Sequence, residues 1–425
     1  RGVYMKLFPK KQIRGELVIP PDKSISHRAV LFSSLARGRS EIVNFLDADD
    51  CLSTIDCMQK LGVRIERNGD RVTVHGNGLH SLKKPGGVLY TGNSGTTTRL
   101  LCGILCGQPF SAEITGDASI CRRPMGRVTE PLHLMGADIV SKDGCCPLTV
   151  LPSPLHGITY PMPHDSAQVK SAILLAGLYA DGATTVIENH PSRNHTELML
   201  SAFGAKLDCA GRSVTVAPAE ELYAQKIEVP GDISSASFFI VAALILSNSQ
   251  LTVKNVGLNP TRTGILDVLR EMGADIEIEN QRLAGREPVG DLTVTSSSLH
   301  GTTLDGEIMP RLIDEIPVIA VAAALADGKT VIRGAGELKV KESNRIDTVC
   351  AELSRAGVDI RATEDGMVIR GGNPIQPATY QSHNDHRIAM ACSVLALAAS
   401  GESRIDGAEC VSISFPSFYQ ILDKL

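Results

Sequence analysis

The sequence predicts an α/β protein in which one unit recurs about six times, arranged as two globular halves of three units each. Two recurring signatures indicate this class. In the first, an apolar helix-like run ends in a small polar turn and continues as a short strand, as in LARGRSEIVNF and LADGKTVIRGA. In the second, a helix end is followed by Gly and two alternating strands, as in LGVRIERNGDRVTV. The length of 425 residues is too great for one ordinary core and fits six such units.

The first signature occurs six times, at intervals of 66 to 80 residues. Glycine or asparagine at its turn fits the left-handed conformation that closes many helices, so we expect that conformation here. The turn residues are Gly38, Gly107, Gly182, Asn248, Gly328 and Gly401.

The second signature is visible only five times. The other copies are MGADIVSKDGCCPLTV, FGAKLDCAGRSVTV, MGADIEIEN followed by DLTV, and AGVDIRATEDGMVI. A sixth copy could be assembled from the two chain ends, because MKLFPKKQIRGELVIP near the start supplies strands.

Two segments are the predicted crossovers between the halves, IPPDKSISHR and IEVPGDISSAS, since each leads from a strand through Pro and Asp into a capped helix. Two strands that link two lobes make a hinge, and hinged lobes usually close on a ligand. The predicted bounds are residues 1–20 and 230–425 for one lobe, 21–229 for the other, and hinges at about 20–22 and 228–232.

Composition excludes several classes of function. A net charge of −5 argues against a general nucleic-acid or membrane-surface binder, and the lack of Trp argues against base-stacking platforms. The longest apolar runs are too short to span a bilayer. None of the eleven cysteines forms a C-x-x-C pair, so we expect reduced thiols in a cytoplasmic protein.

Several stretches place cations or small polar turns at predicted helix starts. The turn in LYTGNSGTTTRLLCGIL would let a ligand approach unpaired backbone N–H groups, although such turns are often plain loops. Cations at helix starts oppose the helix dipole, which indicates a collected anion site. These stretches are PDKSISHR, CRRPMGRV, KVKESNRIDTV and HNDHRIAM.

Each stretch also has a structural explanation. Ser24 and Asp385 are suitable N-caps, and Lys341 and Arg345 are spaced to share one face of a solvated helix. His383, Asp385 and His386 match no common zinc spacing, so capping and hydrogen bonding are favoured over a metal. No phosphate loop or dinucleotide-binding fingerprint is present.

The motifs DKSISHR, GNSGTTTRL, RPMGRV, LIDEIPVIAVAAALADG, KVKESNRI and NDHRIAM together resemble those of the 5-enolpyruvylshikimate-3-phosphate synthases, in order, from about Lys6 to Leu425. The resemblance implies a two-lobed inside-out α/β barrel with three βαβαββ repeats per lobe. It also implies transfer of the enolpyruvyl group of phosphoenolpyruvate to the 5-hydroxyl of shikimate 3-phosphate, with release of phosphate. Neither a metal nor an organic cofactor is implied. The expected partners are these two small molecules, without nucleic acid or membrane, and the expected state is a monomer.

The resemblance also implies site residues. Expected catalytic residues are Lys23, Asp314 and Glu342. The phosphoenolpyruvate set is Lys23, Asn93, Gly95, Thr96, Arg123, Gln168, Arg345, His386 and Arg387. The shikimate 3-phosphate set is Lys23, Ser24, Arg28, Ser166, Ala167, Gln168, Arg193, Asp314 and Lys341. The small Gly95 implies competition by the phosphonate glyphosate against phosphoenolpyruvate.

Three residues depart from the best-known members: Ala167 replaces a second serine, His195 a tyrosine and Ile413 a lysine that helps to hold phosphoenolpyruvate. They are similar to the family's more divergent second class. The near rival is UDP-N-acetylglucosamine enolpyruvyl transferase, but Ala118 stands where its catalytic cysteine belongs, and Ser24 where it has asparagine. A repeat-built binding scaffold without catalysis is the alternative from another class.

Overall fold

A computed structural model describes residues 4–425 of the chain, which divide into two compact units. The first unit comprises the chain up to Pro20 together with Pro230–Leu283 and Glu287–Leu425. The second unit comprises Pro21–Val229 and the short segment Ala284–Arg286. Among the described residues, none of the helices has the length and apolar character needed to cross a membrane.

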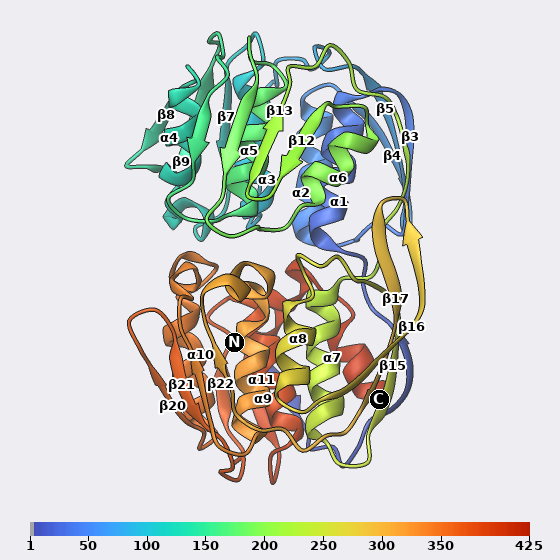
Figure 1. Ribbon diagram of the computed structural model, residues 1–425, viewed down its shortest axis with the longest axis vertical. Helices are drawn as coiled ribbons and strands as arrows, with labels where there is room; N and C mark the ends of the chain where they lie inside the picture. The colour runs from blue at the N-terminus through green and yellow to red at the C-terminus, as the bar shows by residue number, and fades with distance from the viewer. Residues whose placement is uncertain (1–3) are drawn as a thin grey trace. The chain divides into compact units, whose positions relative to one another are not determined.

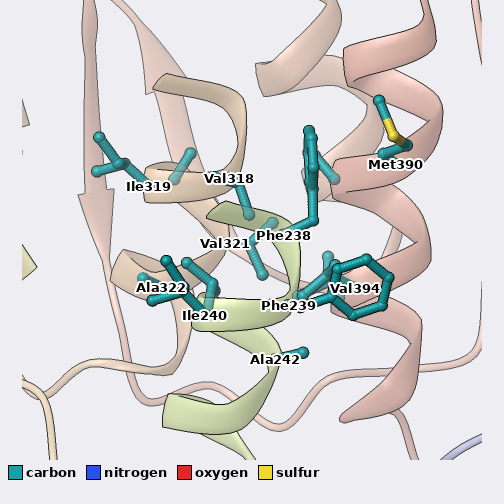
Figure 2. Packing of buried hydrophobic residues seen from close by; sticks show 14 of the residues in the cluster. Phe238, Phe239, Ile240, Ala242, Val318, Ile319, Val321, Ala322, Met390 and Val394 are labelled. Atoms are coloured by element: carbon teal, nitrogen blue, oxygen red, sulfur yellow. The ribbon is translucent and has the colours of Figure 1, made fainter. Parts of the chain in front are cut away.

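Each unit is built around three buried helices. They are α1 (Lys23–Leu35), α3 (Gly95–Cys106) and α5 (Ala167–Gly177) in the second unit, and α7 (Ile233–Ile245), α9 (Ile316–Leu325) and α11 (His386–Leu397) in the first. Every residue of α11 is buried. A helix that is apolar on all sides belongs in a core, and the run IPVIAVAAAL of α9 is of this kind. Figure 2 shows Phe239 of α7, Val321 of α9 and Val394 of α11 within this core.

Three four-stranded sheets belong to the second unit, and their strand order follows one rule. In each sheet, a short edge strand runs parallel to its neighbour, and each of the two following strands runs antiparallel to the strand before it. In order across each sheet they are β14 (Lys226–Glu228), β3 (Arg37–Val43), β5 (Arg71–Asn77) and β4 (Arg64–Asn68); β6 (Leu89–Tyr90), β7 (Ala112–Thr115), β9 (Cys145–Leu151) and β8 (Asp138–Lys142); β10 (Thr159–Pro161), β11 (Thr184–Ile187), β13 (Ser213–Val216) and β12 (Leu207–Ala210).

The first unit repeats the rule in two four-stranded sheets and one of three strands. The sheets are β2 (Arg14–Val18), β15 (Gln250–Gly257), β17 (Glu287–Thr295) and β16 (Asp275–Ala284); β18 (Thr303–Leu304), β19 (Lys329–Ile332), β21 (Met367–Arg370) and β20 (Asp359–Ala362); β22 (Thr379–Gln381), β23 (Ser403–Asp406) and β1 (Tyr4–Leu7). In the last sheet, β1 pairs antiparallel with β23 from the other end of the chain. The predicted assembly of the sixth copy from both chain ends is thus confirmed. Within residues 4–425, this copy has the single strand β1 where each other copy has a pair of antiparallel strands.

Shorter helices and 3-10 turns complete the units. They are α2 (Asp49–Lys60), α4 (Gly126–Leu134), α6 (His195–Ala202), α8 (Gly264–Glu271), α10 (Arg345–Arg355) and α12 (Phe418–Lys424), with turns at Ile120–Arg122, Gly306–Arg311, Ile313–Glu315, Gly336–Val340 and Ala408–Ile413. With sheets outside and helices inside, each unit has the inside-out α/β arrangement that was expected (Figure 1).

The positive φ that we expected at the turn of the first signature is found at three of its six residues. They are Gly38, Asn248 and Gly328, with φ of 114°, 57° and 92°, whereas Gly107 at the end of α3 has φ of −88°. A positive φ also recurs in the second signature, directly after α2, α4, α6, α8 and α10. There the φ values lie between 84° and 101°, at Gly62, Gly136, Gly204, Gly273 and Gly357.

Candidate active site

In the second unit, predicted substrate-binding residues lie at the N-termini of all three buried helices. Lys23, Gly95 and Ala167 are the first residues of α1, α3 and α5. First-turn N–H groups have no partner within the helix and carry partial positive charge. These helix ends therefore favour anionic groups near the predicted residues.

Each of these helices begins with a side-chain cap. Ser94 and Ser166 accept hydrogen bonds from the first turns of α3 and α5. For α1 the cap is Asp22, whose carboxylate accepts from the backbone N–H of Ile25 at 2.8 Å, and not Ser24 as considered above. Ser24 lies within the first turn, so capping no longer accounts for it.

The starts of α3 and α5 are joined by side-chain hydrogen bonds. Arg99 Nη1 donates to Gln168 Oε1 at 2.6 Å, and Gln168 Nε2 donates to Thr96 Oγ1 at 3.0 Å. A Cβ atom on Gly95 would lie 2.6 Å from Arg99 Nη1 and 3.0 Å from Arg123 Nη1. Gly95 therefore lets two guanidinium groups approach the helix start.

Arg123 is a buried cation without a carboxylate partner among the described residues. Its side chain is held by neutral acceptors, because Nη2 donates to Asn93 Oδ1 at 2.9 Å and to Ser119 Oγ at 3.1 Å. Its Nε atom has no hydrogen-bond partner within residues 4–425. A buried charge is costly unless it is paired, so this site is suited to an incoming anion.

Lys23 and Arg28 are held differently. Lys23 Nζ lies 3.0 Å from Asp50 Oδ2 and remains partly accessible. Arg28 is buried, and it donates to Thr196 Oγ1 at 2.8 Å and to Ser171 Oγ at 3.0 Å. Arg28 thus ties α1 to α5 and α6.

Arg193 lies in the loop between β11 and α6 and is partly buried. His195, the residue that departs from the tyrosine of other members, is the first residue of α6 and is buried. Ile413, which stands in place of a lysine, is buried in the turn Ala408–Ile413 of the first unit. A side chain at position 413 therefore has little access to solvent.

In the first unit, the predicted residues meet around Arg345. Its guanidinium group contacts three carboxylates, at 3.3 Å from Asp314, 2.7 Å from Glu342 and 2.9 Å from Asp385. Lys341 Nζ lies 3.7 Å from Asp314 as well. Burial lowers the pKa of Arg345, but the charges of Asp385, Glu342 and Asp314 outweigh it and hold that pKa above its ordinary value.

The solvated helix face proposed for Lys341 and Arg345 is wrong. Helix α10 begins at Arg345 with Asn344 as its cap, so Lys341 lies before the helix. Arg345 is also only 1% exposed, since acidic residues from three separate segments enclose it. The contacts define a buried ionic cluster instead of a surface pair.

His386 and Arg387 are the first two residues of α11 and are buried. Asp385 caps this helix by accepting from the backbone N–H of Arg387 at 3.0 Å, and His383 Nε2 lies 2.7 Å from Glu352 Oε1. These contacts confirm the capping role of Asp385 and the hydrogen-bonding role of His383. Within residues 4–425, no group of three or more His, Cys, Asp or Glu side chains is arranged to hold a metal ion.

Sequence reasoning missed several residues of these networks, among them Arg99 and Asp50. Arg99 ends the quoted GNSGTTTR motif one turn after Gly95, and that spacing was the available signal. Asp50 lies in the first turn of α2, and nothing in its local pattern indicated a contact with Lys23.

A family model described as EPSP synthase (3-phosphoshikimate 1-carboxyvinyltransferase) matches residues 7–422. A 3-phosphoshikimate 1-carboxyvinyltransferase of Thermoanaerobacter sp. (strain X514) is 56% identical over 417 residues, which cover 98% of each chain. One from Desulforudis audaxviator (strain MP104C) is 54% identical and covers 99% of each chain. A solved EPSP synthase from Acinetobacter baumannii has a TM-score of 0.87 and 43% identity, covering 99% of this chain and 98% of the other. The chain therefore belongs to the EPSP synthase family.

Proposed function

We propose that this protein transfers the enolpyruvyl group of phosphoenolpyruvate to the 5-hydroxyl of shikimate 3-phosphate and releases phosphate. As an enolpyruvyl transferase of the shikimate pathway, it acts in aromatic amino-acid biosynthesis. The comparisons favour the shikimate enzyme over UDP-N-acetylglucosamine enolpyruvyl transferase, because the relatives named above are all shikimate enzymes. We further propose that the protein acts as a monomer.

The observation that carries this proposal is the set of cations at the buried helix starts of the second unit, above all Arg123. Both substrates are phosphorylated carboxylates, so they need cations that the protein has not already neutralised. Arg123 is buried and close to Gly95, and within the described part of the chain it is hydrogen-bonded only to neutral acceptors. Arginine binds carboxylate and phosphate groups through paired hydrogen bonds.

The proposed reaction has two proton-transfer steps. In the first, the 5-hydroxyl oxygen bonds to C2 of phosphoenolpyruvate, its proton leaves, and C3 gains a proton. The resulting tetrahedral adduct then loses phosphate and a proton from C3, which restores the double bond. Asp314 is proposed to serve the 5-hydroxyl, and Lys23 and Glu342 to serve C3, with Lys23 also neutralising phosphate.

Phosphate release measured with phosphoenolpyruvate, in the presence and absence of shikimate 3-phosphate, tests the reaction. We expect release only when both substrates are present. Parallel reactions contain UDP-N-acetylglucosamine in place of shikimate 3-phosphate. Turnover with the sugar nucleotide, or none with shikimate 3-phosphate, contradicts the proposal.

A further inference from the structure

The second unit contains a buried charged triad that the proposed reaction does not use. Lys170 Nζ on α5 lies 3.2 Å from Glu188 Oε2 and 3.0 Å from Glu197 Oε2. The side chains of all three residues are at most 7% exposed. A buried ion pair is seldom worth more than apolar packing of the same volume, so its presence calls for another reason.

The triad is joined to the loop that carries Arg193. Glu188 directly follows β11, and its Oε1 atom accepts hydrogen bonds from both the backbone N–H and the hydroxyl of Ser192. Its other oxygen accepts from Lys170. One carboxylate therefore connects α5 to the residue directly before Arg193.

A second carboxylate fixes the same loop at its other end. Asp165, which directly precedes Ser166, accepts from the backbone N–H groups of Asn189 at 2.7 Å and His190 at 2.9 Å. The loop is thus attached at both ends to the segment that begins α5. That segment carries the predicted shikimate 3-phosphate residues Ser166 and Gln168.

We propose that Lys170 is a positioning residue for shikimate 3-phosphate: through Glu188 it fixes the Arg193 loop relative to the start of α5. This inference rests on the proposed function, because it assigns Arg193 to that substrate. A misplacement of about 1 Å at a binding group can cost as much as about 100-fold in rate. Lys170 itself touches neither substrate in this assignment.

The test compares three variants with the full-length enzyme. Lys170→Met removes the contact that attaches Glu188 to α5, but it leaves Glu188 and Glu197 without this cation. Lys170→Met combined with Glu188→Gln removes the attachment and keeps the net charge of the triad. We expect both variants to raise KM for shikimate 3-phosphate by about tenfold or more, with a much smaller change in KM for phosphoenolpyruvate.

Leu148→Ala is the matched control, because Leu148 is a fully buried residue of β9 with no part in the charged networks described here. If its melting temperature is comparable to those of the Lys170 variants, Leu148→Ala should leave KM for shikimate 3-phosphate within about twofold of the wild-type value. If Lys170→Met fails to fold, Glu188→Gln alone replaces it, since it preserves the shape of the side chain. Shikimate 3-phosphate binding is also measured by calorimetry.

The outcomes separate this inference from the proposed function. If the wild-type enzyme neither binds shikimate 3-phosphate nor turns it over, the proposed function fails. If the wild type does both, and the charge-conserving double variant keeps its KM while its melting temperature falls, the triad is merely structural and the inference is overturned. An equal rise in KM for both substrates also overturns it.

Discussion

Replacing Gly95 by alanine tests whether the start of α3 shapes the phosphoenolpyruvate site. The added Cβ would lie 2.6 Å from Arg99 Nη1 and 3.0 Å from Arg123 Nη1. If both contacts relax to an ordinary 3.4 Å, Arg99 moves by about 0.8 Å and Arg123 by about 0.4 Å. Both atoms end flexible side chains, so the substitution displaces charged groups without disrupting the backbone.

The displacement has a calculable consequence. Arg99 Nη1 donates to Gln168 at 2.6 Å, and Arg123 is held by Asn93 and Ser119, so neither group moves without changing a hydrogen bond. Crowding of a filled site costs about 1–3 kcal/mol, which corresponds to about 5- to 150-fold in affinity. Glyphosate, which is longer than phosphoenolpyruvate, should lose tens-fold in inhibition, and phosphoenolpyruvate should lose less.

The assay is a titration of glyphosate against phosphoenolpyruvate at saturating shikimate 3-phosphate, with phosphate release as the signal. Gly126→Ala is the control, because Gly126 is also the first residue of a helix, but its added Cβ meets only Glu130 at 3.4 Å. Control inhibition should stay within about twofold of wild type. Resistance of the wild type to millimolar glyphosate, or unchanged inhibition in Gly95→Ala, would refute the reasoning.

Three further variants test other parts of the molecule. Arg193→Ala should raise KM for shikimate 3-phosphate about tenfold or more and change KM for phosphoenolpyruvate much less, because it removes a charged hydrogen bond; equal changes in both would refute the assignment. Glu342→Gln should lower kcat by about 10²–10⁴-fold while calorimetry still detects shikimate 3-phosphate binding, and retained turnover would exclude it as a general acid or base. Burial, with the charges of Lys23 and Arg28, holds the pKa of His27 well below its ordinary 6.5. The unfolded chain thus gains a proton below about pH 6.5 that the native state resists, and the free energy of unfolding falls by up to about 1.4 kcal/mol per pH unit. Urea unfolding from pH 7.5 to 5 should show a shallower fall in His27→Gln, and identical slopes would contradict this account.

Periodic features of the sequence were the ones that could be predicted. The repeated signatures predicted the α/β class and the pairing of the two chain ends, which β1 and β23 form. The inside-out arrangement was an expectation from the family resemblance. Local capping was less certain, because two polar residues can compete for one helix end. Asp22 caps α1 in preference to Ser24, since its position before the helix allows it to reach Ile25.

The surroundings of single charges could not be predicted from sequence. The spacing of Lys341 and Arg345 suggested a helix face, but the helix begins only at Arg345. Asp314 and Asp385, which enclose that arginine, are distant in sequence and meet it only after folding. The partners of Lys170 could likewise not be predicted, because Glu188 and Glu197 reach it only when β11 and α6 pack near α5.

Arg123 and Arg345 are both buried, but opposite surroundings predict opposite effects on stability. Arg345 is paired with three carboxylates, of which Asp314 also lies 3.7 Å from Lys341, so Arg345→Gln removes a buried cation from all three and should lower the free energy of unfolding by about 3–5 kcal/mol. Among residues 4–425, Arg123 has only neutral acceptors, so Arg123→Gln removes a desolvated charge and should leave stability unchanged or higher. The same variant should weaken phosphoenolpyruvate binding, because the destabilising charge is the proposed anion site. Urea unfolding with phosphoenolpyruvate kinetics tests both statements, and an equal loss of stability in the two variants would show that Arg123 is structural.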